Sequence, residues 1–585
     1  MAKSFAIAPV DPDRPPGVVS HFVMLGLSAV LMGVIYPVLG WWWLAYIALV
    51  PGALVVSRSA SMWRVVWVST LVFWTWWCVM LWWLSPVTVG GTVAAALVLS
   101  VFPTLGWLLI RRLTLQGRLS LTWAVPVAWV LVEFLRTQYP FGGFAWFLLG
   151  HSQGPWRPGH SAMLIQIADL FGELTVTAFV ALVNGFLADV ARQSFSAPKE
   201  GVTLEPLRKR FVARVVVVGV VVATVVGYGM TPPMPSLLPD SSTTVVVIQT
   251  NEPQNNRQSP SLEDRIADWH ALLAETRRSL ESRLDEAEAG SPVVVIWPES
   301  AVPMPINEET LGLAGAEDWA AILTIEGQVR DLAASYGVDL IVGAPAYESW
   351  ELREVDGVKR PVPGMGFNSV FHYRADGTRA ERRYDKMHRV PFGEYLPGMD
   401  LMPWLEDWVV KNLTPYESSY TIQAGTQAVV FEAGEFAVVT PICFEDTVAR
   451  VVREMVGVAL AQSERPVLLV NVTNDGWFRL ESQGYQHLQI AAFRCVENRV
   501  PMAKAANTGV SGLISARGEV VSVVEVEGES KGVLGHLWSS GVQLAPGHVA
   551  DWRGLYGFWG EVPLLVGLFL VGFLGSGVLD RVRRG

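Results

Sequence analysis

Charged residues are scarce in this chain, and cysteine is almost absent. Asp, Glu, Lys and Arg make up 17% of its 585 residues, whereas roughly 25% is typical of soluble domains. The shortage excludes a set of ordinary soluble domains, although the length would hold three or four of them. Three cysteines, one of them inside an apolar run, allow at most one intramolecular disulfide. The chain is therefore not a scaffold built on disulfides.

The charges that are present are divided unevenly along the chain. Residues 1–240 contain 15 Lys and Arg and 9 Asp and Glu, whereas residues 241–579 contain 26 Lys and Arg and 44 Asp and Glu. Residues 1–240 also contain 15 of the 25 tryptophans. A basic, tryptophan-rich, apolar part is thus joined to an acidic part of ordinary composition. Because the only large polar region is acidic, the composition argues against binding to nucleic acid. We expect a membrane protein that carries one large soluble domain.

Eight apolar segments are long enough to cross a bilayer, which takes about 20 residues. They lie near residues 18–38, 40–57, 65–84, 88–110, 119–136, 161–190, 211–229 and 562–579. Lys and Arg gather in every second connection and in the C-terminal tail, and such basic loops stay in the cytoplasm. The pattern predicts a seven-helix transmembrane domain in residues 1–230, an extracytoplasmic domain in 243–545, and a last span with a basic cytoplasmic tail in 556–585.

Two features of the membrane part do not fit simple spanning helices. Gln166, Asp169 and Glu173 open the sixth span, although polar groups are costly in lipid and usually face protein or water. Before them, residues 141–153 are too interrupted to form another span. Two interpretations stay open for this stretch: a polar loop at the outer interface, or the membrane-side wall of an active site.

Residues 243–545 alternate short apolar runs with helical patterns. Strands are expected at 244–249, 293–297, 339–342, 369–373, 437–442 and 467–472, and helices at 262–289, 318–336, 447–462 and 483–498. Several strands are continuous apolar runs, which is typical of sheets covered on both faces. We therefore predict a layered α/β domain.

Side chains suited to covalent catalysis follow two of these strands. Glu299 follows the strand at 293–297, Cys443 follows the strand at 437–442, and Lys386 lies between them in the chain. A carboxylate can take the proton of a thiol, a nearby cation lowers the pKa of that thiol, and a sharp strand exit offers backbone N–H groups to an oxyanion. Taken singly, each residue has an ordinary explanation, such as a core cysteine or a solvated charge. The ordered set favours a nucleophile, a base and a cation.

Four short motifs, taken in order, resemble those of the nitrilase superfamily. They are Trp297-Pro298-Glu299, then Asp385-Lys386 with Phe392-Gly393-Glu394-Tyr395, then Cys443-Phe444-Glu445, and finally Asn474-Asp475-Gly476-Trp477-Phe478. Seven N-terminal spans, an exported domain and one C-terminal span are similar to the apolipoprotein N-acyltransferase family within that superfamily. The stretches 141–146, 166–172 and 249–251 also resemble motifs of that family. The resemblance implies an α-helical membrane bundle of eight transmembrane helices joined to a nitrilase-like α/β domain, an αββα sandwich.

The same resemblance assigns roles to the three reactive residues. It implies Glu299 as general base, Lys386 as the cation beside the oxyanion and Cys443 as the nucleophile. Phe444 stands where the family often has Tyr. Its backbone N–H can still serve the oxyanion, whereas the phenolic hydroxyl is missing.

Further residues match family positions around such a site. Glu394 and Glu445 match acidic positions that support Lys386 and the geometry of the triad. The positions that line the site are matched by Asn368, Asn474 and Trp477, and the membrane-side motif where the acyl chain enters is matched by Gly143 and Trp146.

The resemblance implies a two-step acyl transfer in the bacterial cytoplasmic (inner) membrane, with the catalytic domain on the periplasmic side. Cys443 takes an acyl chain from a phospholipid, the sn-1 chain of phosphatidylethanolamine being the usual donor, and holds it as a thioester. The α-amine of the N-terminal diacylglyceryl-cysteine of an apolipoprotein then receives the chain. No metal and no cofactor are implied. The apolar residues 399–411 are interpreted either as a core helix or, as we favour, as a membrane-dipping lid over the site.

Two other functions stay open at this point. A membrane-anchored amidase or nitrile hydrolase would use the same three residues on a small substrate, but it would need neither the apolar segment 399–411 nor the motif at 143–146. A non-enzymatic binding module would not need an intact set of base, cation and nucleophile. A module of this kind, built as a transporter-like bundle, would also be expected to have charged residues in several spans, and this sequence has no such pathway of charges.

Overall fold

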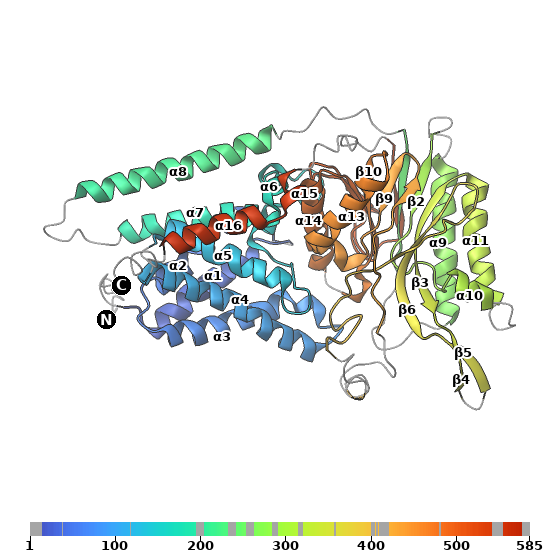
Figure 1. Cartoon of the computed structure of the whole chain (residues 1–585), viewed down its shortest axis with the longest axis horizontal. Coiled ribbons are helices and arrows are strands. Elements are labelled where there is room, and N and C mark those ends of the chain that lie inside the picture. The colour runs from blue at the N-terminus through green and yellow to red at the C-terminus, as the bar shows by residue number, and fades with distance from the viewer. Residues whose placement is uncertain are drawn as a thin grey trace, which may run out of the picture.

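The computed structural model describes residues 15–37, 39–116, 119–194, 204–231, 242–252, 262–283, 291–313, 320–355, 358–398, 404, 408, 421–478, 481–540 and 554–575. Figure 1 shows two parts that meet end to end along the long axis, a bundle of helices and a domain built around β-sheets. The last helix of the chain, α16 (Val562–Gly575), returns from the sheet domain and lies along the bundle. The two parts correspond to the apolar and the acidic regions of the sequence.

The bundle consists of helices at the apolar segments of the sequence. The longer ones before the sheet domain are α1 (Val18–Val34), α2 (Val50–Val56), α3 (Met62–Met80), α4 (Val89–Leu115), α5 (Leu121–Gln138), α7 (Glu173–Ser194) and α8 (Leu204–Met230). The short ones are η1 (Trp42–Tyr46), η2 (Trp82–Leu84), η3 (Leu149–Gln153), η4 (Met163–Ile165), α6 (Ala168–Phe171) and α15 (Leu555–Trp559). Among the described residues, the helices long and apolar enough to cross a membrane are Val89–Leu115, Glu173–Ser194 and Phe211–Met230. By length and composition these three are candidate spans, and the count of eight stays a prediction.

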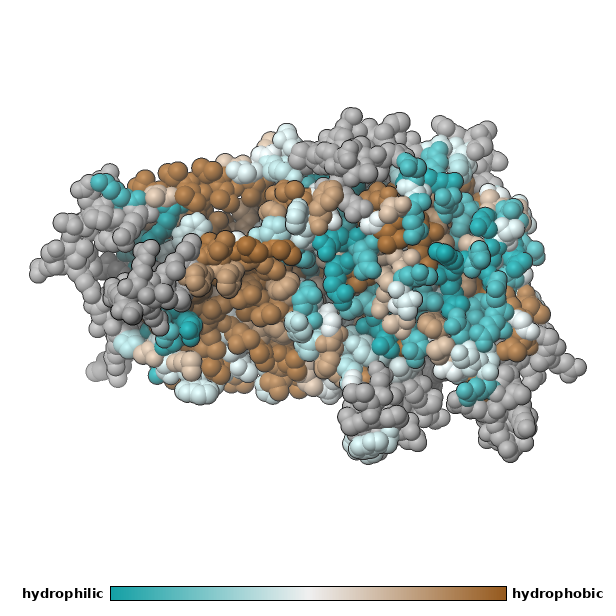
Figure 2. Space-filling model, in the orientation of Figure 1, coloured by the Kyte–Doolittle hydropathy of each residue, from teal (hydrophilic) through white to brown (hydrophobic). Residues whose placement is uncertain are grey.

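Apolar side chains cover the outside of the bundle. Figure 2 shows hydrophobic residues gathered over the helices and hydrophilic ones over the sheet domain. Val19, Trp63 and Phe569 are 76%, 71% and 70% exposed. Apolar surface left in water costs about 25 cal/mol per Å², so a surface of this kind is stable only in lipid. The chain is therefore a membrane protein.

Two six-stranded sheets form the centre of the second part. The first has the order β14 (Gly535–Ser539), β1 (Thr244–Gln249), β2 (Val293–Ile296), β3 (Asp339–Glu348), β6 (Met365–Tyr373) and β7 (Tyr384–Asp385). The second has the order β13 (Val520–Val523), β12 (Gly512–Ile514), β11 (Met502–Asn507), β10 (Val467–Asn474), β9 (Phe436–Val439) and β8 (Phe431–Ala433). In each sheet three parallel strands, β1–β2–β3 or β9–β10–β11, are flanked by antiparallel ones. A separate hairpin, β4 (Glu351–Val355) and β5 (Val358–Val362), projects from the domain (Figure 1).

Helices cover the outer face of each sheet, which gives the predicted αββα sandwich. On the first sheet lie α9 (Leu262–Arg283), α10 (Glu308–Leu313) and α11 (Ala320–Tyr336), and on the second lie α13 (Ala449–Gln462) and α14 (Glu481–Asn498), of which α14 faces the bundle (Figure 1). The six strands and four helices expected from the sequence are present, with shifted ends. The remaining strands, β4, β5, β7, β8 and β11 to β14, were not expected. Among them, β11 has the sequence Met-Ala-Lys-Ala-Ala-Asn, which contains none of the β-branched residues that favour strands.

The carboxyl ends of the parallel strands in the two sheets meet. An isolated bridge pairs Thr250, after β1, with Asn507, the last residue of β11, and so joins the two sheets. A second bridge pairs Ile442, after β9, with Val472 on β10. Loops that leave β2, β9 and β10 therefore face one another across the sandwich.

Candidate active site

Three residues predicted from the sequence meet at this junction. Glu299 follows β2, Lys386 directly follows β7, and Cys443 begins the short helix η8 (Cys443–Thr447) after β9. Nζ of Lys386 lies 4.0 Å from Oε1 of Glu299, and Glu299 and Lys386 both lie close enough to Cys443 for their charges to shift the pKa of its thiol. The structure therefore brings the predicted base, cation and nucleophile into one contact group.

Glu299 is held from both sheets. Its Oε1 accepts a hydrogen bond from Nδ2 of Asn368 on β6 at 2.5 Å, and its Oε2 accepts one from the backbone N–H of Asn474 at 2.7 Å. Burial raises the pKa of Glu299; the charge of Lys386 offsets part of that rise and the charge of Glu394 adds to it. Because a carboxylate with a raised pKa is a stronger base, this environment suits proton abstraction from a thiol.

Lys386 is fully buried and paired. Its Nζ lies 2.7 Å from Oε1 of Glu394, and Oε2 of Glu394 accepts the backbone N–H of Val390 at 2.7 Å. Burial by itself would lower the pKa of Lys386, but the carboxylates of Glu394 and Glu299 outweigh it and raise that pKa. The side chain is therefore a fixed cation, and Glu394 occupies the supporting place that the sequence indicated for it.

Cys443 differs in one respect from the sequence-based expectation. Burial raises the pKa of its thiol, the charge of Glu299 adds to the rise, and Lys386 only partly opposes it. Lys386 lowers the thiol pKa, as the sequence indicated for a nearby cation, but burial has the larger effect.

The backbone at Cys443 is in the left-handed region, with φ of 51°. A residue with a Cβ pays of order 1–3 kcal/mol for such a conformation. The strained turn lies where the chain leaves β9 and enters η8, and the thiol that it carries is half-buried. Asn471 on β10 supports the turn, since its Nδ2 donates to the carbonyl oxygen of Cys443 at 3.2 Å.

Glu445 ties the nucleophile turn to the segment that carries Lys386. Its carboxylate accepts hydrogen bonds at 2.8 Å from the backbone N–H groups of Ile442, Met387 and His388. The hydroxyl of Tyr384 donates to both of its oxygens at 2.9 Å. Burial raises the pKa of Glu445 to about 7. The sequence had assigned no role to Tyr384, and the only signal for it was its place two residues before Lys386.

A row of rings connects the nucleophile turn with the helical bundle. The ring centroid of Phe444 lies 6.1 Å from that of His388 on one side and 6.4 Å from that of Phe144 on the other. Phe144 stacks on Trp146 at 6.3 Å, and Trp146 contacts Trp83 at 5.4 Å. Of the two interpretations of residues 141–153, this contact favours a wall of the site.

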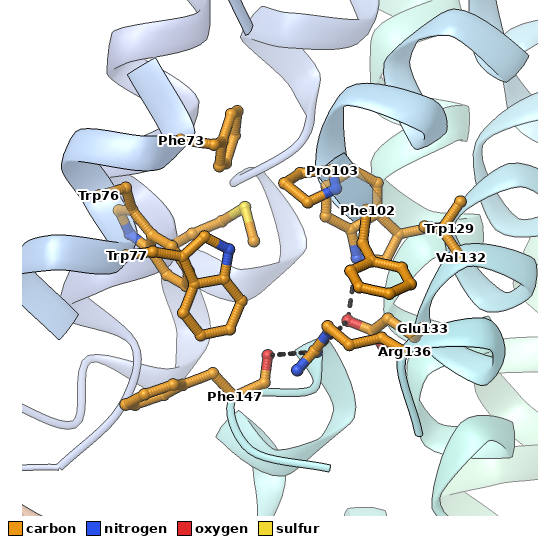
Figure 3. A pocket seen from close by; sticks show the side chains of 11 residues that line it. Phe73, Trp76, Trp77, Phe102, Pro103, Trp129, Val132, Glu133, Arg136 and Phe147 are labelled. Carbon is orange, nitrogen blue, oxygen red and sulfur yellow. Dashed lines mark hydrogen bonds and ion pairs between the residues drawn. The ribbon is translucent and has the colours of Figure 1, made fainter. Parts of the chain in front are cut away.

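The loop that carries Trp146 is anchored inside the bundle, beside the pocket drawn in Figure 3. On α5, Arg136 donates to the carbonyl oxygens of Phe144 at 2.9 Å, of Phe147 at 3.2 Å, and of Trp146. Glu133 lies 3.9 Å from Arg136, and aromatic side chains line most of the remaining pocket. Two buried charged side chains thus fix the path of the loop that reaches the site.

The other predicted residues take different places. Gly143 has φ of 89°, and a Cβ there would lie 2.1 Å from the carbonyl oxygen of Thr137, so only glycine fits. Trp477 is half-buried at the end of η9 (Asp475–Trp477), which follows Asn474. In the apolar segment 399–411, only Trp404 and Trp408 are among the described residues, and they are 70% and 53% exposed.

The polar residues predicted inside the sixth span face the sheet domain. Glu173 pairs with Arg494 of α14. Oδ2 of Asp169 accepts from Nε of Arg499 at 3.1 Å, and Oε1 of Gln166 accepts from Nη1 of Arg499 at 2.7 Å. The expectation that these groups face protein is confirmed, and the sequence had singled out neither arginine. Since all five side chains are buried, they fix α14 and the residue that follows it against the bundle.

Within the described part of the chain, no group of three or more His, Cys, Asp or Glu side chains could hold a metal ion.

Two family models match the chain. Residues 28–186 match the Apolipoprotein N-acyltransferase N-terminal domain, and residues 247–537 match Carbon-nitrogen hydrolase. Together they extend over most of the helical bundle and nearly all of the two-sheet domain.

Several curated relatives are similar over most of their length, each named Apolipoprotein N-acyltransferase. The protein from Geobacter metallireducens is 30% identical over 513 residues, 85% of this chain and 86% of the relative. The protein from Methylococcus capsulatus is 28% identical, over 82% of this chain and 79% of the relative. Among solved structures, an amidase from Nesterenkonia sp. has a TM-score of 0.34 and 13% identity, over 55% of this chain and 96% of the amidase.

Proposed function

This chain belongs to the apolipoprotein N-acyltransferase family, and we propose that Glu299, Lys386 and Cys443 carry out its reaction. The chain is an acyltransferase that N-acylates lipoproteins. The observation that supports the three residues best is that they gather at one place, where Nζ of Lys386 lies 4.0 Å from Glu299 and the charges of both residues act on the Cys443 thiol.

In the first step Cys443 takes an acyl chain from a phospholipid. As sulfur attacks the ester carbonyl carbon, the thiol proton passes to Glu299, and a tetrahedral oxyanion forms beside Nζ of Lys386 and the backbone N–H of Phe444. The bond from that carbon to the glycerol oxygen then breaks, and the oxygen takes the proton back from Glu299. A lysophospholipid leaves, and a thioester remains on Cys443. Preorganised donors of this kind are worth about 10²–10³ in rate each.

In the second step the acyl chain moves to the lipoprotein. The free α-amine of the N-terminal diacylglyceryl-cysteine attacks the thioester carbon and gives a proton to Glu299. The bond between that carbon and sulfur breaks, an amide forms, and the sulfur of Cys443 recovers its proton from Glu299. Proton and electron counts balance over the two steps, and no oxidant or reductant is consumed.

The donor is a membrane phospholipid, and we assign phosphatidylethanolamine to this place. Removing an acyl chain from the bilayer costs about 0.8 kcal/mol per methylene, so a site for such a donor must touch the membrane. The row of rings from Phe444 through Phe144 to Trp146 supports this assignment, because it runs from the nucleophile turn into the apolar bundle. The exposed Trp404 and Trp408 support a lid formed by residues 399–411.

The placement in the cell follows from the distribution of basic residues. We assign residues 1–230 to a seven-helix transmembrane domain, 243–545 to the catalytic domain, and 556–585 to the last span and a cytoplasmic tail. With eight spans, the catalytic domain lies on the periplasmic side of the bacterial cytoplasmic (inner) membrane. The basic connections of the bundle support this orientation, since they would all lie in the cytoplasm.

Mass spectrometry of the intact chain tests this proposal. The detergent-solubilised protein would be incubated with phosphatidylethanolamine whose sn-1 and sn-2 chains differ in length. We expect a mass gain equal to the sn-1 acyl group, reversed when a diacylglyceryl-cysteine peptide is added. A parallel incubation with a small aliphatic amide should release no ammonia. Ammonia release without any acyl adduct would instead assign the site to a small-molecule amidase.

A further inference from the structure

A second group of charged side chains lies buried behind the site. It consists of Asp446 in η8, Asp475 in η9, His487 on α14 and Lys504 on β11, each at most 1% exposed. Nε2 of His487 lies 2.7 Å from Oδ1 of Asp446, and its Nδ1 lies 3.2 Å from Oδ1 of Asp475. Nζ of Lys504 lies 3.1 Å from the other oxygen of Asp446. None of the four takes part in the acyl transfer described above.

The geometry fixes the charge of the imidazole. A ring nitrogen that faces a carboxylate oxygen forms a hydrogen bond only if it carries a proton. Because both nitrogens of His487 face carboxylates, the ring is an imidazolium. Two cations and two carboxylates then balance, which is the condition for burying charges without a large desolvation cost. The carboxylates of Asp446 and Asp475 correspondingly outweigh burial and raise the pKa of His487.

The imidazolium joins two turns of the active site. Asp446 lies three residues after Cys443 in η8, so it holds the nucleophile turn. Asp475 directly follows Asn474, whose backbone N–H donates to Glu299 at 2.7 Å, so it holds the turn that orients the base. A change at His487 would therefore change the distance between nucleophile and base.

The lysine of the group acts on the same turn. Nζ of Lys504 donates to Oδ1 of Asn471, whose Nδ2 donates to the carbonyl oxygen of Cys443 at 3.2 Å. The backbone of the nucleophile is thus held from one side through Asn471 and from the other through Asp446.

The membrane-side motif covers the imidazolium. The ring centroid of Trp146 lies 5.5 Å from that of His487, and Nε1 of Trp146 donates to Oε1 of the neighbouring Gln486 at 2.8 Å. An aromatic face attracts a cation at this distance. The same α14 segment therefore contacts both the acyl-chain side of the site and its two catalytic turns.

We propose that His487 is a positioning residue of the acyl transfer, which as an imidazolium holds Asp446 and Asp475 and thereby sets the separation of Cys443 and Glu299. This inference rests on the proposed function. Loss of the proton would leave an uncompensated negative charge between the two turns, which would then move apart. The titratable groups that face the ring are Asp446, Asp475 and Lys504.

The first test replaces His487 by glutamine in the full chain. We expect His487→Gln to slow the acyl mass gain with phosphatidylethanolamine at least tenfold, and to slow alkylation of Cys443 by iodoacetamide, located by peptide mapping. Gln489→Leu is the matched control, since Gln489 is equally buried on α14 but donates to the carbonyl oxygen of Gly154, away from both turns. It should lower Tm without changing either rate per folded protein.

The second test uses the pH profile, which a merely structural role would not move. Asp446→Asn leaves the imidazole with one carboxylate, so its pKa falls. In Asp446→Asn the loss of acylation rate at high pH should therefore begin at a lower pH than in the wild type. The pH profile of His487→Gln should show no such loss, because the titrating group is gone. An acylation rate within twofold of the wild type in folded His487→Gln, or an unchanged profile in folded Asp446→Asn, would overturn the inference.

The remaining outcomes are also decisive. If neither variant folds, the buried group holds the fold and not the site, which contradicts the inference. If the wild type itself takes up no acyl chain, the proposed function fails, and the alkylation rates still report whether His487 positions the thiol.

Discussion

The backbone N–H of Asn474 donates a hydrogen bond to Oε2 of Glu299 at 2.7 Å, and this bond crosses from one sheet to the other. Glu299 follows β2 of the first sheet, whereas Asn474 ends β10 of the second, next to the strand that delivers Cys443. The orientation of the base therefore depends on how the two sheets dock. A substitution that loosens this docking should slow acyl transfer before it unfolds the chain.

Removing the cation should slow acylation while leaving the nucleophile in place. We expect Lys386→Ala to reduce the rate of adduct formation about 10²–10³-fold, because one oxyanion-stabilising group is lost. Glu394→Gln should slow adduct formation about tenfold. Without Glu394, the nearest carboxylate to Lys386 is Glu299, and the full charge of the lysine would lower the pKa of Glu299 and so make it a weaker base. The control is Glu432→Gln, which removes only an exposed ion pair with Arg465. A Lys386→Ala rate above half that of the wild type would contradict this role.

His388 should make the fold sensitive to acid. Burial lowers its pKa to about 4, whereas the unfolded value is about 6.5. The unfolded chain therefore takes up the proton first, and the stability contributed by the neutral ring is complete above about pH 6.5 and is lost as the pH falls toward 4. Between pH 7.5 and 5 we expect a loss of at most about 2 kcal/mol. Thermal unfolding of His388→Phe, which keeps a ring against Phe444, should show a smaller drop in Tm; an equal drop would refute the assignment.

The proposed lid, residues 399–411, can be tested at Trp404 and Trp408, the two residues of this segment that the structure describes. Because Trp404 and Trp408 are exposed, replacing both by Ser should lower Tm little, yet it should slow turnover of phospholipid in bilayers. Both quantities would be measured on the same preparation. A large fall in Tm, with activity following the folded fraction, would assign the two side chains to the core instead.

The topology can be checked with reporter fusions. A reporter active only outside the cytoplasm should work when fused after Ser241, and it should fail when fused after Arg118 or at Gly585. These outcomes follow from the positions of Lys and Arg in the connections. Activity of the reporter at Gly585 would contradict the count of eight spans.

The residues that meet in the candidate site could be singled out from the sequence because their signals are local. Glu299 and Cys443 each follow a continuous apolar strand, and Lys386 lies in a short motif between them. The α/β character of the domain was visible in the same alternation of runs. Strand β11 was missed because an alanine-rich segment has little intrinsic preference for a strand. It becomes a strand through its parallel pairing with β10, a long-range contact that the sequence does not reveal.

The contacts between the two parts of the chain could not be predicted. Glu173 and Arg494 are 321 residues apart, and nothing in either segment indicates the other. His487 lies in an ordinary helical pattern, and its two carboxylates come from different loops. The net direction of the Cys443 pKa could not be predicted either, because a motif does not reveal burial, which outweighs the effect of the nearby cation.

The identity of the nucleophile is the central claim, and intact-protein mass spectrometry of cysteine variants tests it most directly. Cys443→Ala should abolish the acyl adduct with phosphatidylethanolamine while keeping the fold, because a half-buried thiol at a turn contributes little packing. Cys495→Ala is the matched control, since Cys495 is fully buried on α14 and should be dispensable for the adduct. The account predicts the mass gain in the wild type and in Cys495→Ala, and none in Cys443→Ala. A thioester-sized gain that persists in Cys443→Ala, or that disappears in folded Cys495→Ala, would contradict it.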